Sequence, residues 1–587
     1  MKKIAIVGAG PYGLIALDRL IKQAPCEKIE LLVFDPAGPG GEVWRKEQSD
    51  QVIMNTVMQH VTLFSEEEGP SLAEWSQTEA VKFLSTFAEG DSFLSETKLG
   101  KNDYCQRRYY GVYQCWFFKQ LTEQLPTNIT VSLIKEAVID LTVTKECILI
   151  QASDIHQVTD VILATGHSPN YFIEGKNNED YAKKHELFYQ GPGNPSDTPL
   201  EKILATDTVI IRGVGLSFFD YLALFVDKWG GRFSEENNHL NYLPSGNEQT
   251  LIVGSGRGLP YHTRPKNQKR PSEDAQPQIL TNEFMNQFNG SAQELFDLLR
   301  KEAELVYYQK KLADTKINMP QFLADYRIGE REIILDKYQI PVEDRLDWSV
   351  LFDPAKKVAP QDFPEFVQRY LKKDIEAAAL GNKTGAIASA TDTYKEIQAP
   401  LHAMLDQEKF TPKEYLEDFF GTFKRNYNFL TVGAPIIRQK QLLALIEAGV
   451  VKFLAPEMMV ERIDGQFLAY SKKNPSRSFF SKNLIEARLS ATGLEHTKNP
   501  LLIRMREKGY IVPHYLIIEG KKQLTGAIRV NRKTHQLIAQ DGQILPHIYC
   551  YGLPLEGLDW LNATSPRPKS KDRIFYLANQ MVQTIYR

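Results

Sequence analysis

Cysteine is scarce in this chain of 587 residues, which contains five. No two of them form a C-x-x-C pair, which argues against a redox-active dithiol and against a disulfide framework. The histidines show no ligand spacing of the H-x-x-x-H kind, so we expect no structural zinc and no other metal site.

A strong net charge and a membrane-spanning run are missing as well. The formal net charge is −3, so the chain carries no general positive field that would attract nucleic acid. No apolar run is long enough to cross a bilayer, and the N-terminus leads into a glycine motif rather than a signal peptide. We expect a cytoplasmic protein that binds neither nucleic acid nor membrane. The sequence leaves the oligomeric state open.

The chain begins with an apolar strand that runs into a glycine-rich turn. Residues 4–7 are apolar, the segment 8–13 reads G-x-G-x-x-G, and apolar residues then recur at helical spacing. Gly8 permits the tight turn, Gly10 lets the backbone approach a pyrophosphate, and Gly13 lets the helix pack against the strand. The helix N-terminus then faces the phosphates. The predicted dinucleotide site consists of Gly8, Ala9, Gly10, Pro11, Tyr12 and Gly13.

An acidic residue follows the next strand at the spacing that such a site requires. The strand covers residues 29–34, and Asp35 comes about 20 residues after Gly13. Its carboxylate can accept hydrogen bonds from the ribose hydroxyls. The alternative is a glycine turn without a ligand, which the combination of strand, turn, helix, strand and acid disfavours.

Later segments favour FAD over NAD. Residues 158–163 form a predicted strand that ends in an A-T-G turn, which is typical of flavoproteins with two dinucleotide sites. Residues 134–141 and 148–152 resemble the small β-excursion that precedes this turn and would touch the adenine. The FAD contacts predicted in these segments are Val138, Ala164, Thr165 and Gly166.

The C-terminal segment contains a further strand that runs into a glycine. Residues 548–551 form a predicted strand that runs into Gly552, and residues 572–586 form a predicted closing helix. Such a strand and helix would complete the FAD domain. Leu553 stands where an acid is usual, which weakens the assignment of Gly552 as a flavin contact.

A second strand and glycine turn lies further along the chain. Residues 208–211 are followed by G-x-G-x-x-F, in which Phe218 replaces the third glycine. The next strand, 250–253, ends without an acid, and Ser255 and Arg257 suit the 2′-phosphate of NADP instead. The alternative is a degenerate Rossmann half with Arg257 in an ordinary ion pair. The predicted NADPH contacts are Gly213, Gly215, Ser217, Ser255 and Arg257.

Several motifs are distinctive as a set. They are Gly8 to Gly13, Met54-Asn55-Thr56, Arg107 with Tyr110-Gly111 and Tyr113, Ala164 to His167, Gly213 to Asp220, Tyr242 to Gly246, Gly256 to Tyr261, and Ala444 to Gly449. With them the chain resembles, essentially from end to end, the bacterial FAD/NAD(P)-binding proteins that are distantly related to ornithine and lysine N-hydroxylases and to flavin-containing monooxygenases. Phe218 fits the pattern of this group. Its characterised members include nitrosuccinate synthases and a urate hydroxylase.

The resemblance implies a set of residues around the flavin. Trp44 lies in a segment that would run along the flavin side, with simple core packing as its alternative. Asn55 could hydrogen-bond the flavin or its peroxide, and Thr56 stands beside it. Arg107 begins a basic and aromatic cluster, 107–113, that could bind a substrate carboxylate or pair with local acids. His167 could lie near the flavin, although a lone histidine is more often structural. Asn55, Arg107 and His167 are the catalytic candidates.

The length of the chain predicts two to four domains. We predict an α/β fold with two Rossmann-like dinucleotide-binding domains, as in two-dinucleotide flavoproteins, and a helical insertion. The FAD domain would comprise residues 1–200 and 520–587, and the NAD(P)-like domain residues 203–282 and 450–520. The helical insertion, residues 283–449, would supply the substrate pocket.

These features predict an FAD-dependent oxidoreductase. We expect an NAD(P)H-dependent flavin monooxygenase that uses NADPH and O₂ to oxygenate a small polar substrate, bearing an amine or a carboxylate, through a C4a-hydroperoxyflavin. Two alternatives stay open: a flavin oxidoreductase or oxidase without oxygenation, and a non-catalytic flavin-binding protein whose second nucleotide site is degenerate. The sequence does not identify the substrate.

Overall fold

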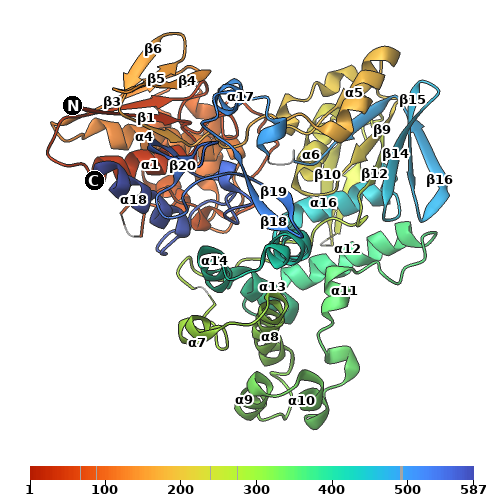
Figure 1. Cartoon of the computed structure of the whole chain (residues 1–587). Helices are drawn as coiled ribbons and strands as arrows, with labels where there is room; N and C mark the ends of the chain where they lie inside the picture. Colours follow the sequence, from red (N-terminus) through yellow and green to blue (C-terminus); the bar gives the residue numbers. More distant parts are fainter. Residues whose placement is uncertain (67, 88, 238, 274, 490–492) are drawn as a thin grey trace. The chain divides into compact units, whose positions relative to one another are not determined.

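A computed structural model describes residues 1–587 except 67, 88, 238, 274 and 490–492 (Figure 1). The chain folds into two compact units, the first formed by Met1–Ile173 with Ser490–Arg587 and the second by Glu174–Leu489. The first unit is therefore discontinuous in sequence. The finer division into an FAD domain, an NAD(P)-like domain and a helical insertion stays a prediction.

The first unit is built on a six-stranded sheet with the order β20-β21-β7-β1-β2-β3. All neighbouring strands are parallel except β20, which runs antiparallel to β21. The C-terminal strand β21 thus joins the sheet that begins at the N-terminus. The strands are β1 (Lys2–Val7), β2 (Ile29–Phe34), β3 (Ile129–Ile134), β7 (Asp160–Leu163), β20 (Gln536–Ile538) and β21 (Ile544–Cys550).

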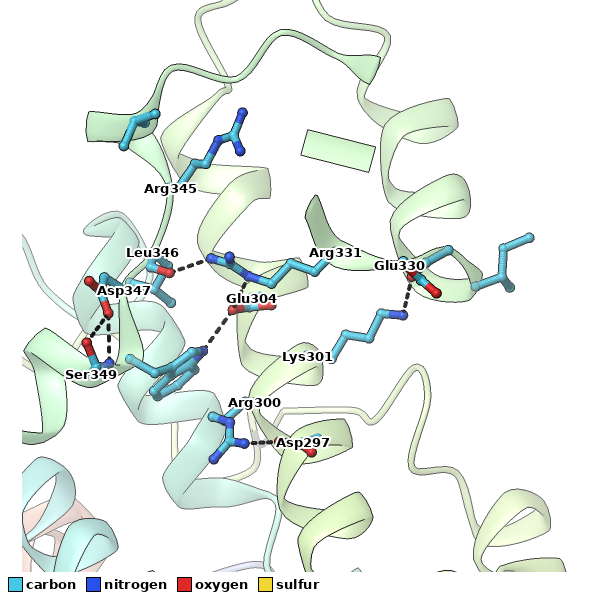
Figure 2. A pocket seen from close by; sticks show the side chains of 14 residues that line it. Asp297, Arg300, Lys301, Glu304, Glu330, Arg331, Arg345, Leu346, Asp347 and Ser349 are labelled. Carbon is cyan, nitrogen blue, oxygen red and sulfur yellow. Dashed lines mark hydrogen bonds and ion pairs between the residues drawn. The ribbon is translucent and has the colours of Figure 1, made fainter. Parts of the chain in front are cut away.

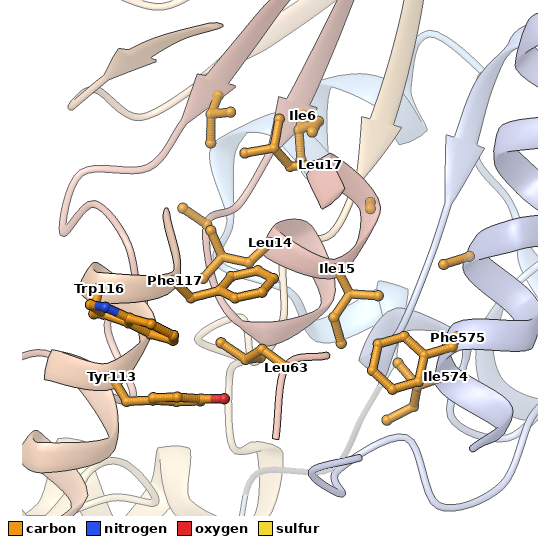
Figure 3. Packing of buried hydrophobic residues seen from close by; sticks show 14 of the residues in the cluster. Ile6, Leu14, Ile15, Leu17, Leu63, Tyr113, Trp116, Phe117, Ile574 and Phe575 are labelled. Atoms are coloured by element: carbon orange, nitrogen blue, oxygen red, sulfur yellow. The ribbon is translucent and has the colours of Figure 1, made fainter. Parts of the chain in front are cut away.

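Alternate residues of β1 enter different cores, as the pleat of a strand requires. Ile4 and Ile6 pack with helices α1, α4 and α18 in an aromatic-rich cluster that includes Phe117 (Figure 3), whereas Ala5 and Val7 pack in a second cluster. The helices of this unit are α1 (Pro11–Lys22), α2 (Leu72–Thr78), α3 (Ala80–Leu84), α4 (Arg107–Glu123), α17 (Pro500–Glu507) and α18 (Arg573–Tyr586).

Smaller strands complete the first unit. Three of them form an antiparallel sheet in the order β4-β5-β6, and two form a hairpin. The strands are β4 (Asp140–Val143), β5 (Ile148–Gln151), β6 (Ile155–Val158), β18 (Pro513–Ile518) and β19 (Lys521–Ile528).

The second unit contains a five-stranded, entirely parallel sheet with the order β13-β12-β9-β17-β8. Helix α6 (Leu216–Trp229) follows β9 directly, and α5 (Ile173–His185) precedes β8. Strand β8 thus pairs in this sheet, although it falls within residues 1–200 of the predicted FAD domain. The strands are β8 (Phe188–Gln190), β9 (Thr208–Arg212), β12 (Thr250–Gly254), β13 (Val451–Phe453) and β17 (Asn483–Glu486).

Two antiparallel sheets accompany this parallel sheet, a hairpin and a three-stranded sheet in the order β14-β15-β16. Their strands are β10 (Arg232–Glu236), β11 (His239–Leu243), β14 (Met458–Ile463), β15 (Gln466–Ser471) and β16 (Asn474–Ser481).

The chain between β12 and β13 is helical. A π-helix, η7 (Glu414–Phe423), interrupts this series and continues directly into α15. The helices are α7 (Asn282–Gln287), α8 (Ala292–Lys311), α9 (Met319–Ile328), α10 (Arg331–Lys337), α11 (Trp348–Phe352), α12 (Phe363–Ala379), α13 (Ala386–Glu396), α14 (Ala399–Asp406), α15 (Lys424–Thr431) and α16 (Ile436–Glu447). Within the described part of the chain, none of the helices combines the length and the apolar character that a membrane span needs.

Candidate functional site

The turn after β1 is shaped by glycines that leave no room for a side chain. Gly8 has a φ of +109°, and a Cβ there would overlap the carbonyl oxygen of Ala164. A Cβ at Gly13 would overlap the carbonyl oxygen of Gly8. Both positions therefore require glycine because of packing, whether or not a ligand is bound.

Gly10 differs from these two positions because the space beside it is open. The nearest atom to a Cβ there would be the carbonyl oxygen of Gly40, at 4.0 Å. Gly10 is the N-cap of α1 and has no side chain to cap the helix, and Pro11 occupies the first helical position. The first turn of a helix leaves N–H groups without intrahelical partners. Open space next to such groups fits a pyrophosphate.

Asp35 ties this turn to the end of β2. Its carboxylate accepts hydrogen bonds from the backbone N–H groups of Ala9, at 2.8 Å, and of Ala37, at 2.9 Å. The side chain is buried, and burial raises the pKa of its carboxyl although the backbone donors act in the opposite direction. Asp35 therefore supports the turn itself, and its contact with a ribose stays a prediction.

The A-T-G turn after β7 lies against the first turn. Ala164 donates its N–H to the carbonyl oxygen of Val7 at 2.9 Å. Among the described residues the buried hydroxyl of Thr165 finds no hydrogen-bond partner, which is costly unless a ligand or water supplies one. Gly166 has a φ of +61°, and His167 is exposed to solvent.

The end of β21 reaches the same place from the other end of the chain. Tyr551 donates its N–H to the carbonyl oxygen of Leu163 at 2.9 Å. Gly552 has a φ of +89°, and the ring of Tyr12 occupies the place of its missing side chain, at 2.8 Å. Glycine at this position is thus explained by Tyr12. Val138, in the loop between β3 and β4, is buried in the second core cluster.

A short backbone ladder carries two of the catalytic candidates. Residues 52–54 pair with residues 105–107 through N–H···O bonds of 2.8 and 2.9 Å. Asn55 follows one strand of this ladder, and the hydroxyl of Thr56 lies 3.5 Å from its side-chain oxygen. Arg107 ends the other strand and begins α4. The structure therefore places Asn55 and Arg107 at opposite ends of one ladder.

Trp44 packs against the first half of α4. Its ring meets the ring of Tyr110 edge-on at 4.8 Å, and a Cβ at Gly111 would overlap the carbonyl oxygen of Trp44. The side chain of Trp44 is only half-buried, so part of it stays accessible. Core packing and a ligand contact are therefore compatible at this residue.

Other side chains of the 107–113 cluster serve the fold. Arg108 donates to the side chain of Gln106 at 2.6 Å and lies over the ring of Phe93 at 4.7 Å. Tyr113 is fully buried and donates its hydroxyl to the carbonyl oxygen of Pro70 at 2.6 Å. Local pairing thus accounts for Arg108 and Tyr113.

The turn after β9 repeats this backbone outline, and aromatic side chains lie next to it. Gly213 has a φ of +115°, in the same left-handed region as Gly8. Phe218, at the third glycine position, is fully buried and packs on the ring of Phe453. The ring of Tyr261 lies 3.8 Å from where a Cβ of Gly215 would stand. Two aromatic rings, those of Phe218 and Tyr261, therefore lie at the N-terminal turn of α6, which also contains Ser217.

Ser255 and Arg257 follow β12 and have partners within their own unit. The hydroxyl oxygen of Ser255 accepts the N–H of Gly258 at 3.0 Å. Arg257 donates to the side-chain oxygen of Asn426 at 2.9 Å, and its guanidinium lies 4.0 Å above the ring of Phe429. Both of these partners of Arg257 are neutral.

Sequence reasoning missed a buried charged pair next to this loop. His262 Nδ1 lies 2.6 Å from a carboxylate oxygen of Asp374, and Nε2 lies 3.0 Å from the carbonyl oxygen of Leu351. Burial alone would lower the pKa of His262, but the facing carboxylate raises it above its ordinary value, and the same interaction lowers the pKa of Asp374. His262 directly follows the Gly256–Tyr261 motif, but its partner on α12 has no signal in the sequence.

A cavity of about 840 Å³ opens among helices α8 to α11 (Figure 2). Its charges largely neutralise one another. The buried carboxylate of Glu304 accepts from Arg331 at 3.0 Å and from Trp348 at 2.8 Å, and Lys301 donates to the carbonyl oxygen of Gly329 at 2.8 Å. None of the predicted flavin or nicotinamide contacts lines this cavity.

The two sheets and their turns define a class of protein. One chain carries two parallel sheets, each with a strand–glycine–helix turn, and the first turn fits the pyrophosphate of a dinucleotide. This is the architecture of dinucleotide-dependent oxidoreductases.

Comparison with known proteins narrows this class. Residues 5–168 match the FAD-NAD(P)-binding family. The chain is 30% identical over 602 residues to a nitrosuccinic acid synthase of Aspergillus oryzae, covering 96% of this chain and 90% of that protein. It is 31% identical over 614 residues to an L-aspartate N-monooxygenase (nitrosuccinate-forming) of Streptomyces cremeus, covering 96% and 92%. The chain belongs to the FAD-NAD(P)-binding family and is a flavin-dependent monooxygenase, which confirms the predicted family and enzyme class.

Solved structures of N-hydroxylating enzymes are similar at much lower identity. An L-lysine 6-monooxygenase of Pseudomonas syringae is 11% identical with a TM-score of 0.46, covering 100% of this chain and 98% of that one. An ornithine N-hydroxylase of Kutzneria sp. 744 is 12% identical with a TM-score of 0.41, covering 99% and 98%.

Proposed function

We propose that this enzyme reduces bound FAD with NADPH and uses O₂ to hydroxylate the amino nitrogen of a small amino dicarboxylate, with L-aspartate as the first candidate. The supporting observation is the end-to-end identity of 30–31% to enzymes named as nitrosuccinate-forming aspartate N-monooxygenases. The step converts the amine, O₂, NADPH and a proton into the hydroxylamine, water and NADP⁺. One oxygen atom enters the new N–O bond, and the other leaves as water.

The first turn is the proposed FAD site. Bound FAD supplies the chemistry that accepts a hydride and activates O₂. The uncapped N-terminus of α1 and the open space at Gly10 would receive the pyrophosphate. The buried hydroxyl of Thr165, which has no hydrogen-bond partner in the described part of the chain, supports a ligand next to the A-T-G turn. Asp35, which already orders the turn through Ala9, would add contacts to the ribose.

Arg107 is the proposed partner of a substrate carboxylate. A guanidinium matches a carboxylate with two parallel hydrogen bonds, and Arg107 begins α4, where the helix dipole also favours an anion. Asn55, at the other end of the same ladder, would hold a polar atom near the reacting nitrogen. The accessible part of the Trp44 ring would exclude water on this side. His167, which is exposed directly after the A-T-G turn, is a further candidate.

The second turn is the proposed NADPH site. Gly215 leaves the N-terminus of α6 without a side-chain cap, as Gly10 does for α1, and Gly213 shapes the turn in front of it. Ser217 in the first helical turn and Ser255 after β12 would add hydroxyl contacts, and Arg257 would bind the 2′-phosphate.

Anaerobic reduction followed by oxygenation tests this proposal. The purified protein should be yellow, NADPH should bleach the flavin, and aerated L-aspartate should yield an N-oxygenated product with one NADPH consumed per oxygen atom transferred. Succinate, which lacks the amine, serves as the control substrate and should give no product. A flavin that stays oxidised with both NADPH and NADH contradicts the proposal, and hydrogen peroxide without any N-oxygenated product supports an oxidase.

A pair of neighbouring arginines tests the substrate contact. Arg107→Met should raise the KM for aspartate about tenfold or more, because a charge-assisted pair is lost. Arg108→Met is the matched control, since Arg108 already bonds to Gln106 and lies on Phe93. Equal effects of the two substitutions would remove Arg107 from the site.

A further inference from the structure

Arg257 is an arginine whose contacts fix its position without neutralising its charge. Its hydrogen bond goes to the amide oxygen of Asn426, and its face lies on the ring of Phe429. Burial and the nearby positive charge of Arg425 lower the pKa of Arg257, and the negative charge of Asp353 offsets this only in part. A cation in such surroundings is stabilised when a phosphate arrives, because the anion can bond to the guanidinium directly.

Phe429 links Arg257 to the buried pair. One face of its ring carries the guanidinium at 4.0 Å, and the imidazole of His262 meets the same ring edge-on at 4.9 Å. The backbone N–H of His262 also donates to the carbonyl oxygen of Phe429 at 2.9 Å. Any shift of His262 is therefore passed to the ring on which Arg257 lies.

His262, in the loop after β12, is held in place by hydrogen-bond acceptors on two helices. Its two ring nitrogens face a carboxylate oxygen of Asp374 on α12 and the carbonyl oxygen of Leu351 on α11. The lowered pKa of Asp374 indicates an ionised carboxylate, so both partners act as acceptors, and this arrangement favours an imidazolium with a hydrogen on each ring nitrogen. Asp374 also accepts from the N–H and the hydroxyl of Thr263, at 2.6 and 2.5 Å. The loop after β12 is thus bound to the helical segment at two consecutive residues.

We propose that the His262–Asp374 pair is a positioning device for Arg257, through which the helical segment makes the second sheet selective for NADPH over NADH. The inference rests on the proposed function of Arg257 as the 2′-phosphate contact. Asn426 and Phe429 lie on α15, which continues directly from the π-helix η7, and π-helical turns are frequent at functional sites. Neither His262 nor Asp374 touches the coenzyme in this proposal.

Coenzyme affinity measured by calorimetry tests the proposal without turnover. NADP⁺ and NAD⁺ are titrated into the flavin-loaded wild type, into Asp374→Asn and into Asp374→Glu. Asp374→Asn should lower the ratio of NADP⁺ to NAD⁺ affinity about tenfold, because Arg257 loses its fixed geometry, and Asp374→Glu should restore part of it. The flavin content and the affinity for NAD⁺ should stay unchanged.

Two further variants guard against a folding artefact. Asn426→Ala removes the hydrogen bond of Arg257 without touching the buried pair and should lower the same ratio about threefold. His239→Gln breaks a different histidine–carboxylate pair, between His239 and Glu447, and should leave the ratio at the wild-type value.

The outcomes separate this inference from the proposed function. An unchanged ratio in both Asp374→Asn and Asn426→Ala overturns the positioning role, even if NADPH reduces the flavin. A wild type that binds NAD⁺ as tightly as NADP⁺ also overturns it. A protein with the predicted ratios that forms only hydrogen peroxide would keep the positioning role and contradict the oxygenation instead.

Discussion

The two strand–glycine–helix turns of this chain share a backbone outline and differ in what occupies them. After β1, the turn contains glycine at all three motif positions, and the space beside Gly10 is open. After β9, Phe218 is buried at the third position, and the Tyr261 ring stands 3.8 Å from where a Cβ of Gly215 would be. Both helices begin without a side-chain cap. The outline of such a turn therefore reports the fold, whereas the side chains around it set the space for a ligand.

Removing the ring of Phe218 should reduce the stability of the protein more than any other change at the two turns. Phe218→Ala leaves a cavity between α6 and β13 and should destabilise the second unit by about 4 kcal/mol. Chemical unfolding followed by fluorescence measures this change. Phe480→Ala, at an exposed site on β16, should have almost no effect. Equal stability of Phe218→Ala and the wild type would show that the ring is not needed to fill the turn.

Adding a side chain at Gly13 of the first turn should reduce stability almost as much. Gly13→Ala forces a Cβ into the carbonyl oxygen of Gly8, so the helix must move, at about 3 kcal/mol of stability. The protein should also be purified without flavin, which its absorption spectrum reports. Gly191→Ala, where a Cβ meets only ordinary contacts, is the control and should keep its flavin. A stable, yellow Gly13→Ala protein would contradict the steric account.

The buried pair beside the second turn should make that unit sensitive to pH. His262 has a raised pKa in the fold, so its stabilising effect is complete below the unfolded value, about 6.5, and is lost as pH rises through the folded value. Asp374 has a lowered pKa, so its effect is lost only when pH falls through that lower value.

His262→Gln should therefore destabilise the protein by about 2 kcal/mol just below pH 6.5. The difference from the wild type should shrink as pH rises further. The groups that face His262 are Asp374 and Tyr370 from α12, the Leu351 carbonyl from α11 and Arg257 from its own loop. A constant difference between pH 6 and 9, measured by unfolding at several pH values, would contradict an ionised His262.

A substitution at Gly10 should have the smallest effect, on FAD binding alone and not on stability. Gly10→Ala adds a Cβ that meets nothing closer than 4.0 Å, so the stability of the flavin-free protein should not change. The methyl group would stand where the pyrophosphate approaches the backbone and should weaken FAD binding about tenfold. Titration of the flavin-free protein with FAD measures the affinity. Unchanged affinity would place the pyrophosphate elsewhere.

Much of the fold could be predicted from the sequence because its signals are local. The strand at 4–7, the glycines at 8, 10 and 13 and the helix after them lie within one short stretch, and each residue type answers a steric need of its neighbours. The C-terminal strand before Gly552 could be recognised by the same kind of pattern, and it does pair with β7.

The candidate site was less accessible to sequence reasoning. The residue pattern around Arg107 suggested one cluster, but Arg108 and Tyr113 bond to their own surroundings. Ser255 suggested a phosphate contact, and its hydroxyl oxygen already accepts a backbone N–H from Gly258. A sequence pattern gives the chemical nature of a side chain but not its partner.

The two turns, the parallel strands that lead into them and the flavin monooxygenase class could be inferred from residue patterns along the chain. The surroundings of the second turn became visible only in the folded molecule. His262 meets Asp374 across 112 positions of sequence, and Tyr261 reaches Gly215 from the loop after β12. The reason is physical: a glycine turn is dictated by neighbours along the chain, whereas these contacts depend on how several helices pack, and the amphipathic pattern of each helix permits more than one packing.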